Sequence, residues 1–482
     1  MVAVQHPSAG MTIDGFRLEE KLHKGGMATL WRVTDTQPER TRENGITPDT
    51  PLLMKIPILG NNDDPAAIVG FEVEQMIMPK LSGIHVPHFI AAGDFTAQPY
   101  IVMELIQGKS LRARFDEAPL PPQEVAAIGA KVATALHDLH RQHVIHLDIK
   151  PSNIMFRPSG EAILIDFGLS RHDLLPDLLA EEFRLPMGTG PYISPEQVLN
   201  IRNDPRSDLF ALGVLMYHLC TGERPYGNPT SINGLRRRLY RDPVPPRALN
   251  PNVPPWLQEI VMRCLEVDAN KRYDTAAQLA FNLQNPKQVQ LTARADKMHR
   301  DGLMTAVKRW FRAIGTEEQP QQSASHQLEL APIVVAAIDV THGSEALAET
   351  LRVTTRRILQ TTPGARLACV TVQKTNRIGM DTIVDEEGRN LHAKNLVRLK
   401  HWARPLNITP GKITYHVLAA PDVAAAIVDY ARVNDVDHIV IGSRGSSTLR
   451  RYLGSVSSQV VAQADCTVTV VKSGPAGSAQ DE

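Results

Sequence analysis

The sequence predicts a multi-domain protein of mixed α and β structure, whose last part is an α/β domain built on a doubly wound parallel sheet. The chain has 482 residues, which is more than one hydrophobic core usually organises. A polar, Gln-rich segment at 317–327 has the composition of a linker. From Pro332 onward, apolar strand-like runs alternate with helical stretches, a pattern typical of parallel sheets covered by helices.

Composition and charge exclude several classes of protein. The chain carries 52 basic and 52 acidic residues, so no net positive field favours a nucleic-acid partner. Its four cysteines are scattered and form no C-x-x-C pair, which argues against a zinc site or a disulfide framework. This usage favours a reducing compartment. The four are Cys220, Cys264, Cys369 and Cys466.

The sequence shows no signal for export or membrane insertion. The first ten residues, MVAVQHPSAG, lack the basic start and apolar core of a signal peptide. The longest apolar stretch, at 209–220, is interrupted by Gly213 and His218 and is too short to span a bilayer. We therefore expect a cytoplasmic protein without a transmembrane segment.

The first elements predicted from the sequence are strands and a helix, with a lysine on one strand and two glutamates on the helix. Residues 16–33 predict two strands joined by a Gly-rich turn at Gly25 and Gly26. Such a turn lets backbone amides approach phosphates, although an ordinary hairpin explains it equally well. Lys55 follows in an alternating apolar strand, LLMKIPI, and the helical stretch FEVEQMIMPKL then offers Glu72 and Glu74.

The most informative motif is HLDIKPSN at 146–153, followed by Asp166-Phe167-Gly168. It places one carboxylate to accept a proton, a lysine and an amide beside it, and a second carboxylate to hold a metal. Phosphoryl transfer from a nucleotide requires these groups together, because its catalysis is mostly positioning and charge neutralisation. The pattern H-x-D-x-K-x-x-N followed by DFG closely resembles the eukaryotic-type protein kinase family.

This resemblance extends in order over 12–285 and implies a bilobal α+β protein kinase fold that uses ATP and Mg²⁺, or Mn²⁺, to phosphorylate a protein substrate. It implies that Asp148 is the catalytic base and that Lys150 neutralises the transferred phosphoryl group. Asn153 and Asp166 would coordinate the metal. Lysine in D-x-K resembles the serine/threonine-specific branch of the family.

The resemblance also assigns the nucleotide-binding residues. Lys55 would hold the α- and β-phosphates and pair with Glu74, which the family spacing selects over Glu72. Backbone groups near Glu104 and Ile106 would bind adenine, with Met103 limiting the depth of the pocket. The family pattern G-x-G-x-x-G is incomplete, because His23 and Ala28 replace its first and third glycines. Nucleotide affinity is the property that this departure affects.

A further departure concerns the activation segment, residues 169–187. Leu147 stands where the family often has the arginine that binds a phosphorylated activation segment. We therefore expect basal activity that does not require phosphorylation there. The following GTGPYISPE resembles the family's G-T-x-x-Y-x-A-P-E. It implies that Thr189 shapes the acceptor site, that Glu196 forms a buried ion pair with Arg272, and that Asp208 anchors the catalytic loop.

Four histidines recur at three-residue intervals before and in the catalytic motif: His137, His140, His143 and His146. A metal cluster is one interpretation of this spacing. The alternative is structural, with His146 hydrogen-bonding inside the catalytic loop and the others on the preceding helix and turn. We favour the structural interpretation.

The second domain begins with the buried strand IVVAAIDV, and alternating helices and strands continue to CTVTVVK at 466–472. Asp339 ends the first strand. The stretch at 439–461 contains Gly442, Gly445, Gly454 and Ser455, whose backbone amides suit a phosphate group. These features resemble the universal stress protein family, a Rossmann-like fold, and imply binding of AMP or ATP. Asp339 would contact adenine or ribose, or else cap the next helix.

The Gly445–Gly454 spacing is one residue short of the pattern in nucleotide-binding members, so a dimerisation domain is the alternative. In that case the last strand would pair with its copy in another chain, giving a homodimer. The second domain has no G-K-[ST] motif, which argues against a Walker-type hydrolase.

Between the domains, one helical face carries apolar residues with basic residues interspersed. We expect this basic amphipathic helix to pack on the chain's own domains rather than to lie on a membrane or to be the target of a partner. The apolar residues are Leu303, Met304, Val307, Trp310, Phe311 and Ile314, and the basic residues are Arg300, Lys308, Arg309 and Arg312.

The expected organisation is therefore an N-terminal tail, a protein kinase domain, a linker with the amphipathic helix, a universal stress protein-like domain and a disordered tail. Their expected bounds are 1–11, 12–285, 286–330, 331–473 and 474–482. The predicted function is bacterial serine/threonine phosphorylation of proteins, with the second domain sensing nucleotide or driving self-association. A pseudokinase scaffold is the alternative, and a third interpretation makes the second domain the functional core and the first its regulator.

Overall fold

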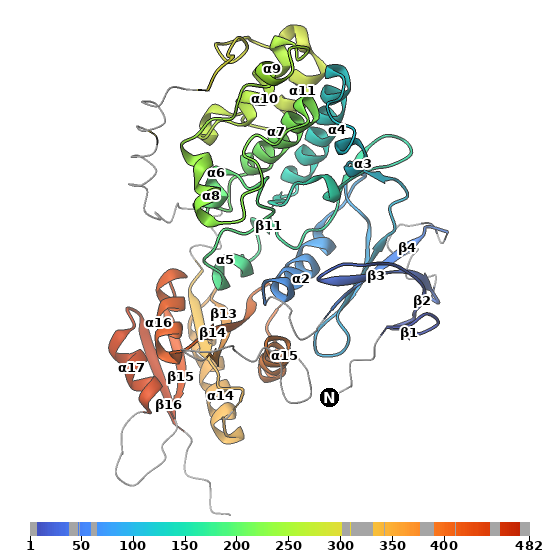
Figure 1. Ribbon diagram of the computed structural model, residues 1–482. Helices are drawn as coiled ribbons and strands as arrows, with labels where there is room; N and C mark the ends of the chain where they lie inside the picture. Colours follow the sequence, from blue (N-terminus) through green and yellow to red (C-terminus); the bar gives the residue numbers. More distant parts are fainter. Residues whose placement is uncertain are drawn as a thin grey trace, which may run out of the picture.

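The computed structural model describes an N-terminal lobe, a larger helical lobe and a separate C-terminal α/β domain that contacts both lobes (Figure 1). The described residues are 7–37, 47, 49–58, 65–300, 309, 331–341, 343–375, 390–409, 411–443 and 454–472. The fold class predicted from the sequence, a bilobal α+β unit followed by an α/β domain, is confirmed.

The N-terminal lobe is a six-stranded antiparallel sheet in the order β1-β2-β3-β4-β6-β5 with one long helix beside it. Apolar residues alternate along its strands and bury Phe16, Trp31, Met54 and Val102 in one cluster. The elements are β1 (Thr12–Ile13), β2 (Phe16–Lys24), β3 (Ala28–Asp35), β4 (Leu52–Pro57), α2 (Pro65–Ile77), η1 (Met78–Lys80), β5 (Phe89–Gly93) and β6 (Tyr100–Glu104).

The helical lobe is built around α7 (Arg206–Thr221), which is buried along almost its whole length. Gly213 in α7 lets α10 approach closely, since a Cβ atom there would lie 2.6 Å from that of Cys264. The other helices are α3 (Arg112–Phe115), α4 (Pro122–Arg141), α8 (Ile232–Arg236), η3 (Arg237–Leu239), α9 (Pro246–Leu249), α10 (Pro255–Cys264), η4 (Ala269–Lys271), α11 (Ala276–Gln284) and η5 (Pro286–Gln288).

Short strands and helices between the lobes carry the sequence motifs. Two small antiparallel sheets, β10-β9-β7 and β11-β8, flank the catalytic motif. The activation segment contains the helix α5, and the helix α6 follows it. The elements are β7 (Lys109–Ser110), β8 (Val144–Ile145), η2 (Pro151–Asn153), β9 (Ile154–Phe156), β10 (Ala162–Leu164), β11 (Arg171–His172), α5 (Leu178–Glu182) and α6 (Pro195–Val198).

The C-terminal domain is a five-stranded parallel sheet in the order β14-β13-β12-β15-β16. Alternate residues of each strand face opposite layers: Val334 joins the layer of α14 and α15, whereas Val335 joins that of α16 and α17. The elements are β12 (Ile333–Ala337), α14 (Glu345–Thr361), β13 (Arg366–Lys374), α15 (Leu391–Ala403), η6 (Arg404–Leu406), β14 (Ile413–Ala420), α16 (Val423–Val433), β15 (His438–Ser443), α17 (Ser455–Gln463) and β16 (Thr467–Lys472).

The helical lobe continues past residue 285. Ala295 is fully buried, and the side chain of Gln258 donates to the carbonyls of Arg294, Ala295 and Lys297. Most of the predicted amphipathic helix, its positions at 303–308 and 310–314, lies outside the described residues, as do the Gln-rich segment, Gly445 and the tail from 474. Within the described ranges, no helix is both long and apolar enough to cross a bilayer.

Candidate active site

The buried carboxylate of Asp208 holds the catalytic loop in place. Asp208, at the start of α7, accepts the backbone N–H groups of His146 (2.9 Å) and Leu147 (2.8 Å) and lies 2.9 Å from Nε2 of His140. These donors outweigh the effect of burial and lower the pKa of Asp208. Leu147 adopts a left-handed φ of 62°, which these contacts help to hold. His140 therefore has a structural role, since it contacts the carboxylate that positions the catalytic loop.

The loop brings together the residues predicted for phosphoryl transfer. Nζ of Lys150 donates to Oδ2 of Asp148 at 2.6 Å. The Thr189 hydroxyl donates to Oδ1 of Asp148 at 2.7 Å, and the Thr189 Oγ1 atom is 3.2 Å from Nζ of Lys150. Asn153 donates through Nδ2 to the backbone carbonyl of Asp148 at 3.0 Å. Asp148 is therefore oriented from three sides, while His146 lies 3.1 Å through Nε2 from the carbonyl of Ile165.

A second group of charges links α2 to the DFG motif. Nζ of Lys55 lies 2.6 Å from Oε2 of Glu74 and 2.9 Å from Oδ1 of Asp166. The Lys55 cation lowers the pKa of Asp166 to about 2, against the opposing effect of burial. Burial lowers the pKa of Lys55, but Asp166 and Glu74 more than compensate and raise it. Lys55 and Asp166 are therefore charged, whereas burial raises the pKa of Glu74 and the Lys55 cation opposes that shift.

The same contact depends on two glycines. A Cβ atom at Gly70 in α2 would lie 3.0 Å from the carbonyl oxygen of Gly168, and one at Gly168 would lie 3.2 Å from that of Gly70. The helix and the DFG backbone therefore approach more closely than side chains would allow. This close approach brings the carboxylates of Glu74 and Asp166 to the same ammonium group of Lys55.

The predicted adenine-binding segment lies at the end of β6. Met103 is buried, and the carboxylate of Glu104 pairs with the guanidinium of Arg157. The N–H of Glu104 donates to the carbonyl of His88 at 2.8 Å, so it is already used within the protein. Ile106 follows and is buried as well. A base bound at this segment would therefore have to use backbone groups other than the N–H of Glu104.

The predicted Gly-rich turn connects β2 to β3. The N–H of Gly25 donates to the carbonyl of Ala28 at 3.0 Å, which closes the turn, and Gly26 has open space around its Cα. The ring of His23 lies 3.8 Å from the position of a Cβ atom at Gly25. The unusual histidine is thus folded against the turn.

The structural ion pair implied by the sequence is present. Both terminal guanidinium nitrogens of Arg272 donate to the carboxylate of Glu196, at 2.5 and 2.8 Å, and the Arg272 side chain is fully buried. Arg272 also donates to the carbonyl of Arg206 at 2.9 Å. This bidentate pair ties α6, the start of α7 and η4 together beneath the acceptor site.

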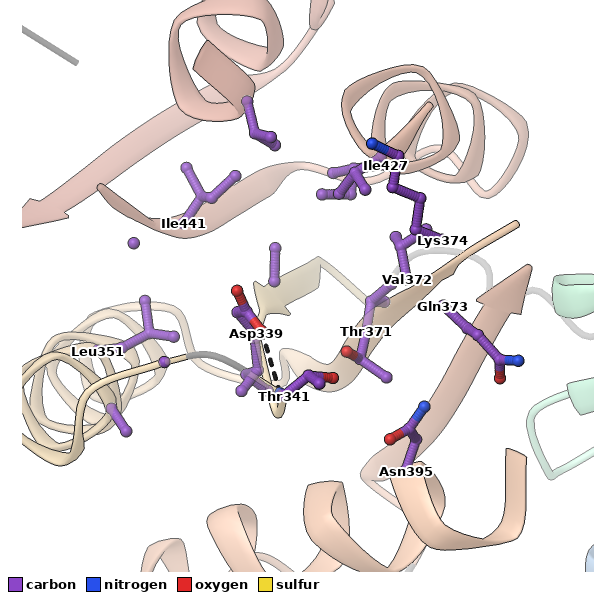
Figure 2. A pocket seen from close by; sticks show the side chains of 18 of the residues that line it. Asp339, Thr341, Leu351, Thr371, Val372, Gln373, Lys374, Asn395, Ile427 and Ile441 are labelled. Atoms are coloured by element: carbon purple, nitrogen blue, oxygen red, sulfur yellow. Dashed lines mark hydrogen bonds between the residues drawn. The ribbon is translucent and has the colours of Figure 1, made fainter. Parts of the chain in front are cut away.

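The C-terminal domain contains a cavity of ≈ 830 Å³ at the carboxyl ends of its strands, within the size range of small-molecule sites. Asp339, Gly442, Gly454 and Ser455 all line it. Figure 2 shows Asp339 and Thr341 at the end of β12, with Asn395 of α15 on another side of the same space. Three cationic side chains also line the cavity: Lys374, Lys394 and Arg398.

Two details of this cavity concern the predicted roles. The carboxylate of Asp339 accepts the N–H of Thr341 at 3.0 Å, whereas the N-cap of α14 is Ser344, which accepts the N–H of Leu347. The N–H of Gly454 donates to the hydroxyl of Ser443 at 3.0 Å, at the start of α17. Asp339 therefore orders the turn before the helix and does not cap the helix itself.

Comparison with known families decides what these two regions are. Residues 63–282 match the protein kinase domain, and residues 332–472 match the universal stress protein family. The chain joins a protein kinase domain to a universal stress protein domain. Both resemblances drawn from the sequence are confirmed.

The kinase domain has relatives among bacterial protein kinases. A probable serine/threonine-protein kinase of Clostridium perfringens is 32% identical over 218 residues, which cover 45% of this chain and 32% of that protein. The serine/threonine-protein kinase PknL of Mycobacterium tuberculosis is 30% identical over 270 residues, covering 56% of this chain and 65% of PknL. PknB of Mycobacterium leprae is 33% identical over 186 residues, covering 38% and 30%. The chain thus spans about one to two thirds of these relatives.

Sequence reasoning missed how the kinase domain holds its activation segment. Arg202 donates through Nε to the carboxylate of Asp177 at 2.9 Å and through a terminal nitrogen to the carbonyl of Leu169 at 3.0 Å. Asp177 in turn caps α5 by accepting the N–H of Ala180. Arg202 is buried, and these partners make its burial possible, because an arginine without them is rarely buried. Nothing in the sequence signals this pairing, because the two residues lie 25 positions apart in irregular chain.

Proposed function

We propose that this chain is a serine/threonine protein kinase that transfers the γ-phosphoryl group of ATP to a protein hydroxyl. The observation that carries the proposal is the convergence of Asp148, Lys150 and Thr189 next to the Lys55–Glu74–Asp166 group. Its relatives named as serine/threonine kinases support the same activity. The lysine at position 150 is typical of that branch.

In this proposal each residue has one task. The acceptor oxygen attacks the γ-phosphorus while its proton passes to the carboxylate of Asp148, and the bond to the β–γ bridging oxygen breaks, releasing ADP. Lys150 neutralises the moving phosphoryl group, and Thr189 keeps Asp148 in place. Lys55 holds the remaining phosphates.

The metal-binding residues fit a hard divalent cation. Asp166 and Asn153 supply oxygen ligands of the type that Mg²⁺ prefers, and the low pKa of Asp166 keeps its carboxylate charged. When bound, Mg²⁺ or Mn²⁺ would neutralise phosphate charge as the leaving group departs. The cofactors in this proposal are therefore ATP and a divalent cation.

The decisive experiment is transfer of labelled γ-phosphate to a generic basic protein, followed by mapping of the modified residues. The wild-type chain should label serine or threonine, whereas Asp148→Asn and Asp166→Asn should lose at least about a hundredfold in rate. Asp116→Asn, which changes an exposed carboxylate outside the catalytic loop, is the matched control. Absence of labelling by the wild-type chain above the level of Asp148→Asn would favour the pseudokinase alternative, which the intact Lys55, Asp148, Asn153 and Asp166 argue against.

For the universal stress protein domain we propose binding of AMP or ATP in its cavity. The cationic side chains on the cavity wall and the start of α17 suit phosphate, and Asp339 suits a ribose or adenine donor. Equilibrium binding of AMP to the full chain carrying Lys55→Met should weaken at least about tenfold when Asp339→Ala is added. Unchanged affinity would place the nucleotide elsewhere.

Self-association is the competing role for this domain. Strand β16 is the last in the sheet order, so its outer edge is where a second copy would pair. Sedimentation analysis across a range of concentrations tests self-association, with Val470→Pro in β16 expected to leave only monomer.

We also propose the cytoplasm as the compartment. This proposal is supported by four cysteines that are free thiols, three of them buried.

A further inference from the structure

The universal stress protein domain packs against two parts of the kinase domain, helix α2 and the activation segment. Helix α5, inside the activation segment, lies between α2 on one side and β14 and α16 on the other (Figure 1). Both α2 and α5 carry acidic residues toward the C-terminal domain. These are Glu72 on α2, and Glu181 and Glu182 on α5.

Glu181 is the centre of the first contact. Its carboxylate lies 2.8 Å from the guanidinium of Arg366 and 3.0 Å from Nε2 of His416, and it accepts the hydroxyl of Tyr430 at 3.2 Å. These three partners come from β13, β14 and α16 and are all buried. Burial opposes ionisation of Glu181, but Arg366 and His416 prevail and lower its pKa to about 2. A buried charge of this kind is tolerated only while its partners stay in place.

Glu182 strengthens the same contact. Its carboxylate oxygens lie 3.7 Å from Nδ1 of His416 and 3.7 Å from Nε2 of His392 in α15. His416 thus stands between two carboxylates of the activation segment, and these raise its pKa to about 9 despite complete burial. The activation segment presents a pair of acids, and the C-terminal domain presents a basic pocket that fits them.

The second contact is made on α2 itself. Nζ of Lys400 in α15 lies 2.7 Å from Oε1 of Glu72, and 5.4 and 5.6 Å from the ring centres of Phe95 and Tyr415. Glu72 and Glu74 are two positions apart, so they point to different sides of the helix. One side of α2 therefore holds Lys55 in the catalytic site, while the other is held by the C-terminal domain.

From these contacts we infer that the universal stress protein domain is an intramolecular activating subunit, which docks on α2 and α5 and holds the kinase domain in its competent arrangement. This inference rests on the proposed kinase function. Docking fixes the helix that brings Glu74 to Lys55, and it fixes the activation segment, which is followed by Thr189 at Asp148. Contacts from the second domain thus do what a phosphorylated activation segment and an arginine at position 147 would otherwise do.

The test is a double-mutant cycle in the full chain. Lys400→Met should lower kcat/KM for peptide phosphorylation about tenfold, with a rise in KM for ATP because Glu74 no longer holds Lys55. Glu72→Gln should have a smaller effect in the same direction, and the double variant should be no worse than Lys400→Met. Lys412→Met, an exposed lysine of the same domain, is the matched control.

Hydrogen exchange supplies the second measurement. In Lys400→Met, peptides of α2 and α5 should lose protection, while β12, β13 and β15 stay protected, which shows that the domain is folded but undocked. Unchanged protection of α2 and α5 would overturn docking through this pair. Lost protection with unchanged activity, or with increased activity, would overturn the activating role. If the wild-type chain transfers no phosphate, the proposed function fails, and the exchange result still decides whether the two domains dock.

Discussion

The kinase site and the cavity of the universal stress protein domain are built in different ways. The kinase site is assembled from distant segments whose charges hold one another, as in the group of Lys55, Glu74 and Asp166. The cavity instead lies at the shared carboxyl edge of parallel strands, where Asp339 follows β12 and Gly442 lies near the end of the neighbouring strand β15. The difference indicates that chemistry requires side chains fixed by other side chains, whereas binding can be supplied largely by the backbone framework.

The largest expected effect separates the two sites. Lys55→Met should lower the phosphoryl-transfer rate at least about a hundredfold, because it removes the cation that pairs Glu74 and Asp166. It should leave AMP binding to the C-terminal cavity unchanged. Lys394→Met removes a cation that lines that cavity, so it should weaken AMP binding and leave the phosphoryl-transfer rate unchanged. Rate and AMP affinity are measured on both variants, and loss of both properties in either one would show that the sites are not independent.

The second prediction concerns stability in the kinase domain. Arg272→Met leaves Glu196 buried without its bidentate partner and should cost about 3–5 kcal/mol of unfolding free energy. Chemical denaturation of the full chain, followed separately for the two domains, measures it. Arg432→Met, whose ion pairs lie on the exposed side of α16, should change little. A loss no larger than that of Arg432→Met would mean that the buried pair is not structural.

The third prediction is a pH dependence of docking. His416 faces Glu181, Glu182, Thr414 and Tyr430, and its pKa is raised to about 9 when the domains are docked. An undocked histidine titrates near about 6.5, so the charged form favours docking. This contribution is complete below about pH 6.5 and is lost as the pH rises through about 9. Glu181, with its pKa lowered to about 2, stays charged over that whole range.

The measurement for this prediction compares the wild type with His416→Gln between pH 6.5 and 9.5. The ratio of their kinase activities should be largest at the low end and should approach one as His416 loses its proton in the wild type. A ratio that stays constant or rises with pH would contradict the prediction.

The smallest expected effect concerns phosphorylation of the activation segment. Leu147 cannot bind a phosphate, and the segment is instead held by Arg202 and Arg366 through Asp177 and Glu181. Complete dephosphorylation should therefore lower activity by less than about tenfold, or 1.4 kcal/mol of barrier. Phosphatase treatment followed by a rate measurement checks this, and a larger loss would show that a phosphate group supports the segment after all.

Much of the fold could be predicted from the sequence because it is encoded locally. The alternation of buried strands and amphipathic helices after Pro332 predicted the parallel sheet, and the catalytic motif predicted the loop around Asp148. The residues that tie segments together were harder to predict. Arg202 and Asp177 carry no motif, and only the family spacing favoured Glu74 over Glu72 as the partner of Lys55.

The sequence alone determined the two domain families and the chemical groups available to them, because periodicity and short motifs are properties of neighbouring residues. Tertiary structure alone decided that the second domain would reach the activation segment. Tyr430 and Glu181 are 249 positions apart, and no local pattern relates them. Burying a charged side chain is costly unless a partner is buried beside it. Which partner that is depends on how the complete domains pack against each other.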